Sequence, residues 1–159
     1  MAKVSYASLK LKTKTDVKTF DYEGSTIEVL QYLPFEDKYS LIMITLQNAL
    51  EEGIYNPLRL DMYFHLFLVY LYTNITFTDK QREDELKLYD TLHSSGFIAK
   101  MLEHISEVEY NTLYIYLEET AECLVEYKNT LKYFVQNLLG KILHKYKRNW
   151  YLTKGLPIR

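Results

Sequence analysis

Residues 106–145 read SEVEYNTLYIYLEETAECLVEYKNTLKYFVQNLLGKILHK. No proline occurs between Pro57 and Pro157, and Gly140 is the only glycine in the stretch. Proline and glycine are the residues that most disfavour a helix interior, so this composition favours an uninterrupted helix. Ser106 and Glu109 have the spacing of a capping box, which starts a helix. The stretch therefore predicts one long α-helix over residues 106–148.

A heptad repeat of mostly apolar residues, which we call the seam, follows this helix. Its members lie four and three residues apart: Leu117, Ala121, Leu124, Lys128, Leu131, Val135, Leu138 and Ile142. Such a repeat is typical of coiled coils. A helix of about 40 residues is roughly 60 Å long, which is more than a compact domain of this size requires. The seam can pack against the protein's own helices or against another chain, and both alternatives stay open at this point.

Residues 4–33 carry the strand signals, and we expect residues 1–33 to form a β-hairpin element. Leu9 and Leu11 alternate with lysines, which predicts a strand with one solvent-facing side. Residues 17–22 and 26–32 flank Glu23-Gly24-Ser25, which predicts an antiparallel β-hairpin. Two or three strands alone are only marginally stable, so we expect this element to rest on helices.

Residues 34–105 have helical periodicity. A first helix is predicted from Pro34 to about Glu52, with Gly53 as its stop. Its expected buried face consists of Tyr39, Ile42, Met43, Leu46 and Leu50. Asn56-Pro57 predicts the start of a second helix that ends near Asn74. Because this second helix is apolar almost all round, we expect it to be central.

Two shorter helices complete this predicted helical core. Thr78 and Gln81 have capping-box spacing and open a charged helix to about His93. A short helix over residues 97–105 follows. The fold class is therefore mainly α: a helical bundle with a small N-terminal antiparallel β-element and a long C-terminal helix. We expect a single domain over residues 1–159, whose last part, 149–159, is a basic tail.

Composition and charge narrow the function classes. The chain of 159 residues is 48% hydrophobic and 25% charged, as in soluble globular proteins. Residues 1–12 contain no apolar run of signal-peptide length, and the longest apolar stretch, 62–72, is about half a membrane span. We therefore expect neither secretion by a signal peptide nor a membrane partner.

The net charge of −2 conceals a strong segregation of charge. Residues 19–126 hold 20 acidic and six basic side chains, whereas residues 127–159 hold eight basic side chains and no acidic one. Three interpretations remain open: stabilisation of the long helix by its macrodipole, self-association of basic ends with acidic bodies, and nucleic-acid contact through residues 145–150, KYKRNW.

Three groups of side chains could carry chemistry, and each has a simpler interpretation. Asp61 and His65 lie one helical turn apart, but two ligands are too few for a metal, and a hydrogen-bonded histidine is the better interpretation. Cys123 is interpreted as a small core residue. Glu118, Glu119, Glu122 and Glu126 lack the Glu-x-x-His motif of carboxylate-bridged iron bundles. We expect no catalytic, cofactor-binding or metal site, and no enzyme.

Two segments carry a resemblance to known proteins. Residues 27–34, IEVLQYLP, with Asp37-Lys38, and residues 72–79, YTNITFTD, resemble small proteins encoded among the structural genes of tailed bacteriophages of low-GC hosts. The likeness covers about the first 100 residues. It implies a virion component or assembly factor of head, connector or tail, located in the host cytoplasm during assembly and then in the virion. It implies no catalytic residue.

The functional expectation is a non-enzymatic structural or assembly protein that acts through protein–protein contacts in an oligomeric complex. Its expected partners are further copies of itself or other virion proteins. The alternatives are a phage-encoded inhibitor of a host protein and a nucleic-acid-binding accessory protein that uses the basic C-terminus. The candidate partner-binding residues are Leu117, Leu124, Leu131, Val135, Leu138, Ile142, Lys141, Lys145, Lys147, Arg148 and Trp150.

Overall fold

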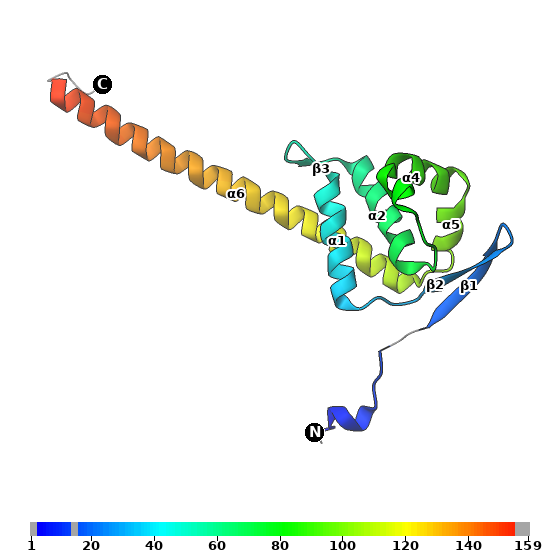
Figure 1. Cartoon of the computed structure of the whole chain (residues 1–159). Coiled ribbons are helices and arrows are strands. Elements are labelled where there is room, and N and C mark those ends of the chain that lie inside the picture. The colour runs from blue at the N-terminus through cyan, green and yellow to red at the C-terminus, as the bar shows by residue number, and fades with distance from the viewer. Residues whose placement is uncertain (1–2, 14–15, 155–159) are drawn as a thin grey trace. The chain divides into compact units, whose positions relative to one another are not determined.

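A computed structural model describes the backbone of residues 3–13 and 16–154 (Figure 1). It describes side-chain surroundings within these ranges up to residue 132 and for Val135. By packing, the chain divides into two units, residues 1–117 and 118–159. The predicted fold class is confirmed: the first unit is a set of helices with a small antiparallel β-element, and the C-terminal helix is long.

The predicted hairpin is present as strands β1 (Val17–Tyr22) and β2 (Ser25–Leu30), which pair antiparallel with Phe20 opposite Ile27. Its turn is Glu23-Gly24, and both residues have positive φ, at 48° and 79°. Two positive φ values in a row produce a tight turn that matches the twist of paired strands. Phe20, Ile27 and Val29 point into the core.

The strand predicted around Leu9 and Leu11 was wrong. Residues 6–9 form a short 3-10 helix, η1 (Tyr6–Leu9), and the described residues 10–13 belong to no strand. Residues 3–13 are all exposed. Alternation of apolar and charged residues indicates a strand only where a neighbouring strand supplies hydrogen bonds and a core covers the apolar side. The described residues 3–13 have neither.

Helix α1 (Phe35–Ala49) is shorter than predicted, because the chain turns into a second small hairpin, β3 (Leu50–Glu51) and β4 (Ile54–Tyr55). Gly53 does adopt a left-handed conformation, with φ 85°, but it does so in the hairpin turn with Glu52. Helix α2 (Pro57–Tyr72) starts as predicted: the Asn56 side chain accepts hydrogen bonds from the N–H groups of Leu58 and Arg59.

The buried face of α1 differs from the predicted one. The structure buries Leu41, Thr45 and Ala49 in addition to the predicted Ile42 and Leu46, whereas Tyr39 and Leu50 are exposed. Thr45 and Ala49 are small, which permits a close approach to a neighbouring helix, and α1 packs against α2. The prediction favoured large apolar residues and therefore placed the stripe about one position too far along the helix.

Helix α2 lies at the centre of the first unit, as predicted. Its buried side chains face several directions around the helix: Met62, Tyr63, Phe64, Leu66, Leu68, Val69 and Tyr72. Val29 of β2 forms a bridge with Thr73 just after this helix, and the Asn74 side chain accepts a hydrogen bond from the Glu28 N–H. The hairpin therefore rests on the end of α2.

Three short helices connect α2 to the long helix. The capping box of Thr78 and Gln81 is confirmed at the start of α3 (Asp79–Glu83). A new helix, α4 (Glu85–Ser94), begins after Asp84, whose side chain caps it. The single helix predicted over this range is therefore two helices. After Gly96, with φ 78°, α5 (Phe97–Leu102) buries Phe97, Ile98 and Met101.

Helix α6 (Glu107–Lys154) begins with a buried carboxylate. Glu109 Oε1 accepts hydrogen bonds from the Leu33 N–H at 3.0 Å and from the Tyr72 hydroxyl at 2.8 Å. Glu109 Oε2 pairs with Lys38 Nζ at 2.7 Å, and both side chains are about nine-tenths buried. Glu109 therefore connects α6 to the end of the hairpin, α1 and α2, and does not serve the capping box predicted with Ser106.

Replacement of Glu109 by Ala should lower the free energy of unfolding by about 3–5 kcal/mol, because it leaves the Lys38 ammonium buried without its partner. The double variant Lys38→Met, Glu109→Gln removes both charges, so its loss should be smaller than the sum of the two single losses. Urea unfolding followed by circular dichroism measures these differences. Glu51→Ala, which removes an exposed carboxylate from an ion pair, is the matched control and should change stability far less.

Candidate interaction surface

Beyond Leu117, the large apolar side chains of α6 that the structure describes are mostly exposed. The exposed fractions are 41% for Val125, 66% for Tyr127, 52% for Leu131 and 44% for Val135. Leu124 is half-buried. Scattered single apolar residues are common on protein surfaces, but Leu131 and Val135 belong to the heptad repeat of the seam, and Val125 and Tyr127 lie next to its members. The exposed seam is therefore a candidate interaction surface.

The predicted partner-binding residues fall into three groups. Leu117 is 2% exposed and belongs to the core of the first unit, so we leave it out of the surface. Leu124, Leu131 and Val135 lie on the described part of the seam. The other predicted residues lie in α6, but their side chains are outside the described ones: Leu138, Lys141, Ile142, Lys145, Lys147, Arg148 and Trp150.

Charge divides the second unit at Lys128. Residues 118–127 contain Glu118, Glu119, Glu122 and Glu126, all four exposed, and no basic residue. From Lys128 to Lys154 there are seven basic residues and no acidic one. The helix continues to Lys154, so the basic tail predicted to start at 149 is helical over its first part. The second unit therefore has an acidic section followed by a basic section, and the seam runs through both.

Cys123 is exposed, contrary to the interpretation of this residue as part of a core. It lies between two seam residues, Ala121 and Leu124, but does not itself have seam spacing. The apolar neighbours suggested burial. A single helix without a covering neighbour at this position leaves the thiol in solvent.

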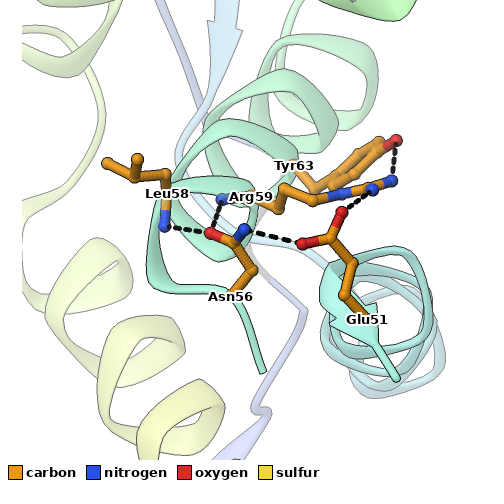
Figure 2. Close-up of polar contacts among 5 residues, drawn as sticks. All are labelled: Glu51, Asn56, Leu58, Arg59 and Tyr63. Carbon is orange, nitrogen blue, oxygen red and sulfur yellow. Dashed lines mark hydrogen bonds and ion pairs between the residues drawn. The ribbon is translucent and has the colours of Figure 1, made fainter. Parts of the chain in front are cut away.

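A second candidate lies at the start of α2, where four polar side chains interact (Figure 2). Glu51 Oε1 pairs with Arg59 Nη1 at 2.6 Å, and Glu51 Oε2 accepts a hydrogen bond from Asn56 Nδ2 at 2.7 Å. Arg59 Nη2 also donates to the Tyr63 hydroxyl at 3.3 Å. The Asn56 hydrogen bond, followed by that of Arg59, lowers the pKa of Glu51, and Glu51 raises the pKa of Arg59.

This cluster borders an open hollow of about 500 Å³. Its remaining walls are Glu83, Asp84 and Glu85 with the exposed Leu58 and Leu86. Carboxylates outnumber the guanidinium, so the hollow would attract cationic groups. Arg59 is already paired with Glu51, and within the described residues no three metal-ligating side chains converge. The cluster's clear role is to hold the β3–β4 hairpin against α2.

Asp61 and His65 are hydrogen-bonded, as the sequence predicted. His65 Nδ1 lies 3.0 Å from the main-chain oxygen of Asp61 and 3.3 Å from Asp61 Oδ1, and His65 Nε2 lies 3.3 Å from the Tyr110 hydroxyl. The Tyr89 hydroxyl donates to Asp61 Oδ2 at 3.2 Å. The pair therefore links α2 to α4 and α6 within the first unit.

The site that sequence reasoning missed is the buried contact of Lys38 with Glu109. Lys38 also lies over the Tyr32 ring, 4.2 Å from its centroid. The sequence does contain one signal for the burial of Lys38. This residue lies three positions before Leu41 and seven before Thr45, which is the spacing of the buried face of α1. Its partner lies 71 residues away in the sequence, so the pairing itself had no local signal.

Comparisons with protein-family models, with curated proteins and with solved structures found no match to this chain. Within the part of the chain that the structure describes, no helix has the length and hydropathy needed to cross a membrane.

Burial raises the pKa of several tyrosines in the first unit. The strongest case is Tyr72, which is fully buried and whose hydroxyl donates to the Glu109 carboxylate, so ionisation would place two negative charges together. Burial is also the first cause of the raised pKa of Tyr110, Tyr89 and Tyr70. In the folded state these phenols therefore stay protonated at a pH where the unfolded chain ionises.

The free energy of unfolding should consequently fall as pH rises above about 10, the ordinary tyrosine pKa. The sign follows from the linkage between proton binding and folding. A group whose pKa is raised in the folded state contributes stability below its unfolded pKa. This stability is lost above the unfolded pKa, by up to about 1.4 kcal/mol per pH unit for each such group. Absorbance at 295 nm against pH measures the ionisation of the tyrosines, and circular dichroism against pH measures unfolding. Ionisation of all tyrosines near pH 10 with the helical signal intact would contradict the structure.

Proposed function

We propose that this protein is a non-enzymatic structural or assembly protein that acts through protein–protein contacts in an oligomeric complex. The observation that carries the proposal is the exposed seam of α6. Its members Leu131 and Val135 are 52% and 44% exposed, and Val125 and Tyr127, which lie next to seam residues, are also at least two-fifths exposed. A single helix of this kind gains most of its stability from packing of its apolar face. The exposed seam accordingly needs a partner.

The division of the chain supports the same proposal. Residues 1–117 contain a core in which α2 is surrounded, and the buried Glu109 connects α6 to three other segments. Residues 118–154 continue the same helix. A well-packed unit that is covalently continuous with an exposed apolar helix is suited to presenting that helix to another molecule.

The more specific proposal is a component of a tailed-phage virion, in its head, connector or tail. Its support is the resemblance of residues 27–34 and 72–79 to proteins of that class, together with an interaction helix that structural and assembly proteins require. In purified particles of a phage that encodes this chain, mass spectrometry should find the protein at a constant ratio to the major capsid protein. Its absence from particles, although infected cells contain it, would contradict a permanent virion role.

The purified protein should sediment as an oligomer at low salt, and Leu131→Asp should weaken its association at least about tenfold, because a charge in the seam must be desolvated on packing. Association should also weaken at high salt, since separated surface charges are then screened. Sedimentation velocity across a concentration series measures both effects.

Asn129→Asp is the matched control, because Asn129 is exposed and lies outside the seam spacing. It adds the same charge and should leave the association nearly unchanged. Thermal unfolding of the first unit should be the same in both variants. A monomer at every salt concentration, together with no partner recovered by pulldown, would contradict the proposal.

A further inference from the structure

The seam has a second regularity that bears on which molecule covers it. Leucine occupies every seventh residue, at Leu117, Leu124, Leu131 and Leu138, and the alternate seam positions hold Ala121, Lys128, Val135 and Ile142. These are the two core positions of a heptad, conventionally d and a. Three of the four a positions are apolar, so Lys128 is the exception and lies near the middle of the seam.

Lys128 distinguishes between the two ways in which a helix can pair with its own copy. In a parallel, in-register pair each a residue faces the same residue of the other helix, so two Lys128 ammonium groups would share one core layer. In an antiparallel pair an a residue faces a d residue. Lys128 then faces a leucine of the second copy, and its aliphatic stem can cover that leucine while the ammonium reaches solvent.

The charge distribution favours the same orientation. An antiparallel pair centred between Leu131 and Val135 sets Lys128 against Leu138 and Leu124 against Ile142 of the second copy. It also brings the acidic section, residues 118–126, alongside residues 140–148 of the second copy, which hold Lys141, Lys145, Lys147 and Arg148. A parallel pair would instead place acidic section beside acidic section and basic section beside basic section over the whole length.

We propose that residues 118–148 of α6 pair antiparallel with the same residues of a second copy of this chain. The inference rests on the proposed function and specifies its partner. The two-fold arrangement is self-complementary, since each acidic section meets a basic section at both ends of the pair. The exposed Leu131 and Val135 lie at the centre of the overlap, where burial contributes most to association.

Disulfide trapping tests the orientation. In a Cys123→Ser background, Leu124→Cys and Ile142→Cys are prepared separately, one with a mass tag, and oxidised mildly alone and after mixing. The antiparallel pair predicts linked dimers in the mixture, at least about tenfold above either variant alone, because Cys at 124 faces Cys at 142. Glu126→Cys mixed with Ile142→Cys is the control for random collision, since Glu126 lies outside the seam.

A second measurement uses the unmodified chain, so it does not depend on the cysteine variants folding. Zero-length carboxyl–amine crosslinking of a mixture of ¹⁴N- and ¹⁵N-labelled protein should join Glu122 or Glu126 of one copy to Lys141 or Lys145 of the other. Disulfides formed by each cysteine variant alone would overturn the inference in favour of a parallel pair. A monomeric wild-type protein that binds a different partner through the seam would also overturn it, while the proposed function would stand.

Discussion

The rest of the structure depends on the buried carboxylate of Glu109. Its two oxygens bind the Leu33 N–H, the Tyr72 hydroxyl and the Lys38 ammonium, which come from the end of the hairpin, from α2 and from α1. A buried charge is tolerated only when it is paired and hydrogen-bonded, so the segments that supply its partners must be in place together. Because Glu109 lies in the first turn of α6, this requirement also determines where the long helix begins.

Local signals were sufficient for much of the fold. Asn56-Pro57 and the Thr78–Gln81 capping box start helices as predicted, and the apolar composition of α2 placed it at the centre. The errors arose where distant contacts override local pattern. Lys38 is buried because Glu109 neutralises it, and Leu9 and Leu11 alternate without a strand to pair with.

For the candidate surface, the heptad spacing of the seam was visible in the sequence, but its exposure was not. Spacing shows which residues share a stripe, whereas the neighbours of that stripe depend on the whole fold. Leu117 and Leu131 have equivalent positions in the repeat, yet one is buried and the other is half exposed. The described structure therefore divides a continuous pattern into a part that stabilises the first unit and a part that we propose binds another chain.

The account's central claim is that α6 beyond Leu117 is covered by association. Hydrogen–deuterium exchange of the amides of residues 118–135, followed over a dilution series, tests it directly. Protection should fall steeply on dilution, because an isolated helix frays, while the amides of α2 stay protected as an internal reference. The account would be contradicted if exchange at residues 118–135 of the purified protein did not depend on protein concentration and if lysate of the cells that express the protein did not change this result.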